Sequence, residues 1–80
     1  MLSEQLVKDV LVELLDADPG SLAMDVRFDE IEGWDSVGAL RILVYLERQV
    51  GRSLDFERFT KAGTLGELAA VVADAQAAAA

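Results

Sequence analysis

The chain has 80 residues, 52% of them hydrophobic, with no cysteine, no histidine and a formal net charge of −8. This length suits one small domain that must be stabilised by its core, because neither disulfides nor the usual zinc sites are available. The same absences exclude Cys-His and Ser-His catalysis, and the acidic charge argues against nucleic-acid binding, which needs Lys and Arg. No apolar run is long enough to span a membrane and no basic signal-peptide region is present, so we expect no membrane association and a cytoplasmic location.

The first predicted element is an amphipathic helix that ends before Asp18-Pro19-Gly20. Ser3 is suited to the N-cap position and Glu4 to the first turn. The apolar residues of this segment recur at helical spacing: Leu2, Leu6, Val7, Val10, Leu11, Leu14 and Leu15.

The segment 17–35 that follows shows no strong period, and so long a connection in a small domain is usually functional. We expect Phe28 and Ile31 to pin it to the core, with one short helical turn as a way to do so. Residues 1–35 hold ten acids and two bases, and residues 36–80 hold five of each, so the whole charge excess precedes Ser36. Both a solvated loop and a surface that steers a basic partner fit this distribution. Four of these acids crowd just before Ser36: Asp29, Glu30, Glu32 and Asp35.

A second helix is predicted from Ser36 to Val50, with Gly51 as its left-handed C-terminal stop. At about 100° per residue, one face gathers the apolar core residues Ala39, Ile42, Leu43, Leu46 and Val50. A second apolar stripe runs from Ser36 through Val37, Leu40 and Val44. Such a stripe is either buried or offered to a partner; for Leu40 both remain open, and for Val37 docking is favoured. The rest of the helix is kept in solvent by Arg41, Glu47 and Arg48.

The last elements are a short capped helix at 55–59, with Phe56 and Phe59 facing inward, and a final helix. Thr64 and Glu67 form a capping-box arrangement at the start of that final helix. Its apolar residues are Leu65, Leu68, Val71 and Val72. The sequence therefore predicts an all-α fold, a small four-helix bundle of three main helices and one short one. Residues 1–76 would form the single domain and the alanines at 77–80 a disordered tail.

The run Gly33-Trp34-Asp35-Ser36-Val37 carries the functional signal. A serine hydroxyl at the positive end of a helix dipole is a favourable place for a phosphate group. Without catalytic partners, Ser36 looks like a substrate for another enzyme; a hydrolase would also need a base and an oxyanion hole. Asp35-Ser36 equally reads as an N-cap pair, and both interpretations can hold together. The loop lacks the regularly spaced ligands of a calcium site, so no metal is expected.

This run, followed by an apolar helix ending in Leu46-Glu47 and Gly51, resembles the acyl and peptidyl carrier proteins, whose signature is an Asp-Ser-Leu-like triplet opening the second helix. The resemblance covers nearly the whole chain. It implies that a phosphopantetheinyl transferase joins phosphopantetheine from coenzyme A to Ser36, with Asp35 presenting the serine to the transferase and its magnesium. The arm's thiol would then hold cargo as a thioester. The resemblance thus implies a monomeric carrier, not an enzyme, working between an adenylating or acyl-loading enzyme and downstream condensing or tailoring enzymes.

The type of carrier is indicated by the second helix. Carriers of fatty acid synthesis usually place acids along it, where this chain has Gly38, Arg41 and Arg48. The run Val37-Gly-Ala-Leu-Arg-Ile-Leu looks more like carriers of nonribosomal peptide assembly, including free-standing aminoacyl carriers. A nonribosomal peptide or polyketide role is therefore favoured, with a fatty-acid-type carrier or an unmodified acidic helical adaptor as alternatives. The residues predicted to dock partners are Trp34, Val37, Leu40, Arg41 and Val44.

Overall fold

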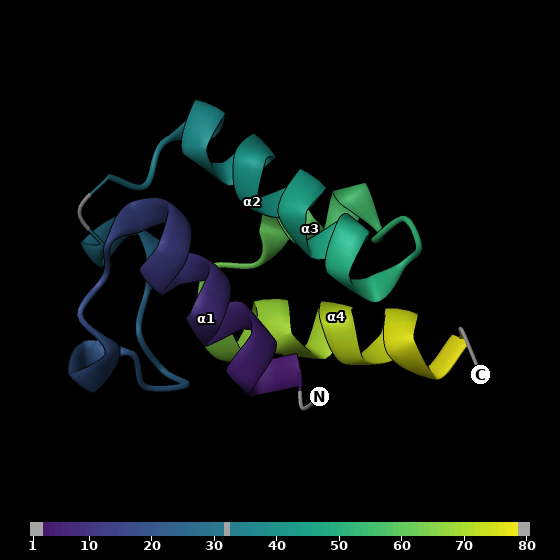
Figure 1. The fold of residues 1–80 in the computed structure, drawn as a ribbon, viewed down its shortest axis with the longest axis horizontal. Helices are drawn as coiled ribbons and strands as arrows, with labels where there is room; N and C mark the ends of the chain where they lie inside the picture. The colour runs from purple at the N-terminus through teal and green to yellow at the C-terminus, as the bar shows by residue number, and fades with distance from the viewer. Residues whose placement is uncertain (1–2, 32, 79–80) are drawn as a thin grey trace.

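The structure is a computed structural model that describes residues 3–31 and 33–78. Its helices are α1 (Ser3–Leu15), α2 (Ser36–Val50), α3 (Phe56–Lys61) and α4 (Leu65–Ala78). Two 3₁₀ turns, η1 (Pro19–Ser21) and η2 (Phe28–Glu30), lie in the long loop after α1 (Figure 1). The predicted all-α bundle of three main helices and one short helix is confirmed.

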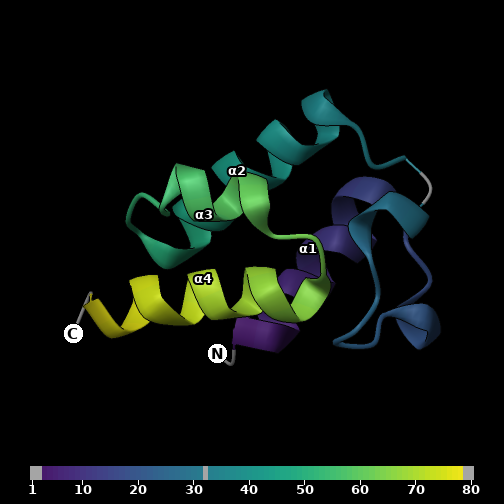
Figure 2. The same ribbon diagram turned by 180° about the vertical axis from the view of Figure 1, so that it is seen from behind.

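The helices pack around α1, which contacts both α2 and α4. The chain runs along α1 toward the end of the molecule that holds the long loop, and α2 and α4 both run away from that end (Figures 1 and 2). No polar or charged side chain is buried within the described part of the chain. The core residues with the least exposure come from these three helices: Val7, Val10, Leu11, Ile42, Leu46, Leu65, Leu68 and Val72.

The bounds predicted for α2 are confirmed at both ends. Gly51 has a left-handed φ of 81°, and its N–H donates to the Glu47 carbonyl oxygen at 2.8 Å, which ends the helix. The Glu47 carboxylate accepts a hydrogen bond from the Leu54 N–H at 2.9 Å and so ties α2 to the loop that follows. By contrast, Ser3, expected to cap α1, is itself helical.

The short helix α3 corrects one sequence prediction. Asp55 caps it by accepting a hydrogen bond from the Arg58 N–H, and Phe59 is buried as predicted. Phe56, also predicted to face inward, has 55% of its surface exposed. Helix α3 has only six residues, and Phe59 fills its inner face. Phe56 is the first residue of α3 and lies beside the groove between α3 and α2.

The start of α4 confirms the expected cap. The Glu67 N–H donates to Thr64 Oγ1 at 3.2 Å, and the Glu67 carboxylate accepts from the Gly63 N–H at 3.1 Å. The helix continues through residues 77 and 78, the first two alanines of the expected tail; residues 79–80 lie outside the described residues. No helix in the described part of the chain is long and apolar enough to cross a membrane.

The long loop is fastened to the beginning of α4. Backbone hydrogen bonds join Phe28 N to the Gly63 oxygen at 3.0 Å and Gly66 N to the Met24 oxygen at 2.8 Å. Phe28 is buried and Ile31 partly buried against the core, as predicted for the residues that pin the loop. The end of the loop is therefore held in place where it leads into α2.

Candidate functional site

Ser36 is the first residue of α2, so its side chain lies at the N-terminal end of a 15-residue helix. The residue is exposed, and its hydroxyl has no hydrogen-bond partner among the described residues. The free N–H groups of a first helical turn give this end a partial positive charge that favours a phosphate. With no histidine or cysteine in the chain, nothing of the usual kind can activate this hydroxyl from within.

Asp35 is the N-cap of α2. Its backbone is extended (φ −146°), its Oδ1 accepts a hydrogen bond from the Gly38 N–H at 2.6 Å, and its carbonyl oxygen accepts from the Ala39 N–H at 2.8 Å. The carboxylate thus satisfies one free N–H of the first turn and places negative charge at the positive helix end. Asp35 therefore fixes the backbone from which the Ser36 hydroxyl projects.

Gly38 is needed for the close packing of this turn. A Cβ atom at this position would lie 3.1 Å from Asp35 Oδ1 and 3.2 Å from the Gly33 carbonyl oxygen. Both distances are shorter than ordinary van der Waals contact. The absence of a side chain at Gly38 therefore lets the preceding loop lie directly on the first turn of α2.

Trp34 anchors the loop immediately before the site. Its ring stacks on the buried ring of Phe28, with centroids 4.2 Å apart and an angle of 10° between the planes. Trp34 is only partly buried, and its exposed part lines the same groove as Ser36. The stacked pair connects the core to the Asp35-Ser36 step, a structural role that the sequence did not indicate for Trp34.

The second apolar stripe of α2 lies in solvent. Val37, Leu40 and Val44 keep 67%, 51% and 53% of their surfaces exposed. For Leu40, which the sequence left open between burial and exposure, the structure gives exposure. An unbroken apolar stripe beginning next to Ser36 is the kind of surface that a partner covers.

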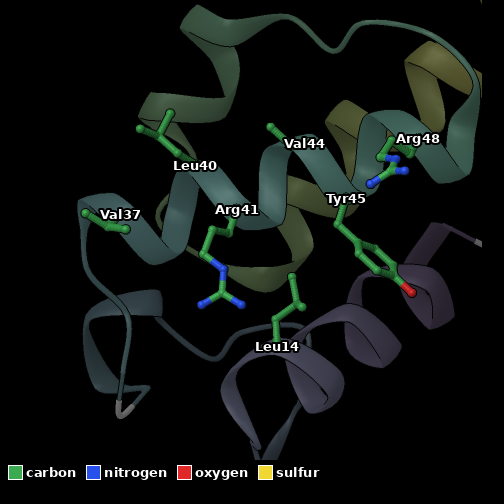
Figure 3. A pocket seen from close by; sticks show the side chains of 7 residues that line it. All are labelled: Leu14, Val37, Leu40, Arg41, Val44, Tyr45 and Arg48. Atoms are coloured by element: carbon green, nitrogen blue, oxygen red, sulfur yellow. The ribbon is translucent and has the colours of Figure 1, made fainter.

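Two shallow grooves border this stripe. The α2–α3 groove, of about 340 Å³, is lined by Trp34, Ser36, Ala39, Leu40, Phe56, Phe59, Thr60 and Ala62. The α1–α2 groove, of about 440 Å³, is lined by Leu14, Val37, Leu40, Arg41, Val44, Tyr45 and Arg48 (Figure 3). Leu40 borders both, and the attachment candidate Ser36 opens onto the first.

Many acids ahead of Ser36 are engaged locally. Asp29 forms an ion pair with Arg27 at 2.8 Å, and the Glu30 carboxylate accepts from the Arg27 N–H at 3.3 Å. The Asp35 carboxylate caps α2 by accepting the Gly38 N–H. Glu32, the remaining acid of the predicted cluster, lies outside the described residues. The described acids therefore stabilise the local backbone through these contacts, in addition to giving the loop a negative charge.

Tyr45 joins α2 to α1 inside the α1–α2 groove. Its hydroxyl donates to the Glu13 carboxylate at 3.1 Å. This hydrogen bond and the negative charge of Glu13 raise the pKa of Tyr45 above its ordinary value of 10.0, against the opposing charge of Arg48. This pair could not be predicted from the sequence, because residues 32 positions apart meet only through helix packing.

No group of three or more acidic side chains in the described part of the chain is arranged to hold a metal ion.

The other residues that the sequence missed are Phe56 and Thr60, which line the α2–α3 groove opposite Ser36. A groove formed between two helices depends on their packing, so helical periodicity alone does not reveal it.

The chain was compared with known protein families. The family described as phosphopantetheine attachment site matches residues 5–72, which include the α2 start, both grooves and most of the core. Among curated proteins, no sequence matches this chain significantly.

Proposed function

The chain belongs to the phosphopantetheine attachment family, and from that premise we propose that it is a carrier protein whose arm is joined to Ser36. Members of this family carry phosphopantetheine covalently on a serine. The observation that carries the assignment is the exposed, unbonded Ser36 hydroxyl at the first residue of α2, inside the matched segment.

The other three serines fit the role less well. Ser3 lies outside the matched residues, and the Ser21 hydroxyl donates to the Asp18 carbonyl oxygen at 2.8 Å. Ser53 follows the C-terminal end of α2, where the helix dipole is negative and disfavours a phosphate. Among the serines in the described part of the chain, Ser36 alone combines exposure, a hydroxyl without a described partner and the positive end of a long helix.

The residues around Ser36 fit the group that the family carries. The first turn of α2 supplies a positive helix end for the phosphate of the arm, and the Asp35 cap holds that turn in place. The arm itself supplies a terminal thiol, which holds cargo as a thioester in a chain that has no cysteine. Asp35 directly precedes Ser36 in the chain, and we propose that it presents the serine to the transferase and its metal.

We place the catalysis of attachment and transfer in the partners: a phosphopantetheinyl transferase, an adenylating or acyl-loading enzyme, and condensing or tailoring enzymes. Neither histidine nor cysteine is available beside Ser36, and the Asp35 carboxylate is engaged with Gly38. We further propose that the chain is monomeric and cytoplasmic and that it has no nucleic-acid or membrane partners.

The cargo we favour is an aminoacyl or peptidyl group of a nonribosomal peptide or polyketide pathway. The support is the charge of α2: Arg41 and Arg48 are exposed, whereas its one acid, Glu47, is half-buried and bonded to Leu54 N. A fatty-acid-type carrier, with acids along this helix for basic partners, is the second candidate. An unmodified acidic adaptor is the third.

The proposal is tested in two steps on the whole chain. Incubation with a promiscuous phosphopantetheinyl transferase, coenzyme A and magnesium should add one phosphopantetheine by intact mass. The modified protein is then offered panels of adenylating enzymes with amino acids and, separately, a fatty-acyl-loading enzyme. Aminoacyl mass gain supports the favoured cargo, fatty-acyl gain alone supports the second candidate, and no modification at all supports the adaptor.

A further inference from the structure

The α1–α2 groove combines an apolar floor with two arginines. Leu14 of α1 and Val37 and Val44 of α2 supply apolar surface, and Arg41 and Arg48 line the same groove. In Figure 3 the Arg41 guanidinium and the Leu14 side chain point toward each other between the two helices, and Tyr45 extends from α2 to α1. This surface lies beside Ser36 but is separate from the α2–α3 groove onto which Ser36 opens.

The charges of this groove are not neutralised within the described part of the chain. Neither Arg41 nor Arg48 forms an ion pair there. The carboxylates of Glu13 and Glu47 keep their charge, but they accept hydrogen bonds from the Tyr45 hydroxyl and the Leu54 N–H and form no ion pair with either arginine. The groove therefore presents two exposed cations beside apolar surface, in a chain whose net charge is −8.

The spacing of these residues matches a helical partner. Val37, Leu40 and Val44 form one ridge along α2, and Arg41 and Arg48 lie two turns apart on the adjacent ridge. Helices pack by fitting such ridges into the grooves of another helix, and an amphipathic helix lays its apolar face into an apolar groove such as this one. Acids flanking the anchors would meet the arginines, because carboxylates pair with guanidinium groups in well-defined geometry.

We propose that the α1–α2 groove docks an amphipathic helix of a partner enzyme that carries carboxylates beside its apolar face. This inference rests on the proposed function and specifies the chemistry of its partner. The apolar stripe supplies most of the affinity, and Arg41 with Arg48 selects an acidic partner helix over a basic one. Residues 1–35 hold ten acids against two bases, so a partner is oriented with its basic surface toward Ser36 and its acidic helix along α2.

The test uses two synthetic helical peptides of equal length and identical apolar face, one with Glu and one with Lys at the flanking positions. Each is titrated into the ¹⁵N-labelled unmodified chain, and amide shifts are followed by NMR. We expect saturable binding of the Glu peptide, with shifts at Val37, Arg41, Val44 and Arg48, and weaker binding of the Lys peptide. Arg41→Glu and Arg48→Glu should each weaken Glu-peptide binding roughly three- to tenfold, and the double variant should bind the Lys peptide better.

Arg58→Glu is the matched control, because it changes net charge equally at an arginine paired with Asp74 away from the groove; it should leave peptide binding within about twofold. Equal binding of both peptides, shifts confined to other surfaces, no saturable binding of the Glu peptide, or an equal effect of Arg58→Glu would each overturn the inference. Transferase modification of the same samples, read by intact mass, separates the two proposals. A chain that gains phosphopantetheine but shows no preference for the acidic peptide retains the proposed function and loses the inference.

Discussion

The Asp35 carboxylate accepts a hydrogen bond of 2.6 Å from the Gly38 N–H, directly across the first turn of α2 from which Ser36 projects. One side chain thus caps the helix and orders the backbone of the site, and it belongs to the residue directly before the candidate attachment serine. The capping role is a property of the structure, whereas the presenting role belongs to the proposed function. The two can be separated by substitution.

Asp35→Asn should keep the cap, since Asn and Asp cap helices about equally well, and should slow phosphopantetheine transfer because the charge is lost. Asp35→Ala should also lower stability by about 0.5–2 kcal/mol. Asp55→Ala, which removes the analogous cap of α3, is the control: it should cost stability without slowing transfer. Urea unfolding and transfer kinetics measure both effects, and unchanged transfer in Asp35→Asn would refute the presenting role.

Phe28 is expected to hold the loop that leads to the site. It is 3% exposed and stacks on Trp34, so Phe28→Ala should destabilise the fold by roughly 3–5 kcal/mol. This is a large share of the stability of a small domain. Phe56→Ala removes the same ring from a half-exposed position and should cost about 1 kcal/mol. Equal melting temperatures for the two variants would show that the loop is held without Phe28.

Much of this fold could be predicted from the sequence, because the features that indicate it involve residues close together in the chain. Both ends of α2 could be predicted from Asp35-Ser36 and Gly51, since a cap and a left-handed stop depend on neighbouring backbone only. The prediction that Phe56 faces inward was wrong, because six residues hardly define a helical face. The packing of α3 against its neighbours determines which of its side chains are buried. Helix α4 extends into the alanine run as far as residue 78, because alanine has the highest helix propensity.

For the exposed residues of the site, too, local features could be predicted from the sequence, whereas contacts between distant segments could not. The stripe of Val37, Leu40 and Val44 followed from helical spacing, but only the packing of α2 against α1 and α4 shows that Leu40 is exposed. The pairing of Tyr45 with Glu13 and the α2–α3 groove arise from contacts between distant segments. No periodicity within one helix encodes them.

Partner recognition along α2 should depend mainly on the apolar stripe. Val37→Asp or Val44→Asp should slow loading by the enzyme found in the panel at both low and high salt, because a desolvated contact is screened little. Arg41→Glu should do less harm, and its effect should shrink as salt is added. Loading kinetics for each variant at two ionic strengths provide the measurement. Normal loading of both aspartate variants together with failure of Arg41→Glu would mean that a specific arginine contact governs recognition.

Tyr45 provides a pH test of the α1–α2 contact, because it is the only tyrosine. Its pKa is raised by the hydrogen bond to Glu13, so phenolate absorbance should appear above the pH at which tyrosine titrates in the unfolded chain. A raised folded-state pKa means that this bond stabilises the fold below the unfolded pKa and ceases to do so as pH rises through the folded pKa. Glu13→Gln should lower the pKa of Tyr45, and an identical titration in that variant would contradict the contact.

The central claim, that Ser36 is the attachment residue, is tested most directly by intact mass of the original chain and of Ser36→Ala after incubation with a promiscuous phosphopantetheinyl transferase, coenzyme A and magnesium. Circular dichroism first establishes that the variant remains helical, since Asp35 still caps α2. We expect one phosphopantetheine on the original chain and no mass gain in Ser36→Ala. Modification that persists in Ser36→Ala, or an original chain that is never modified, would contradict it.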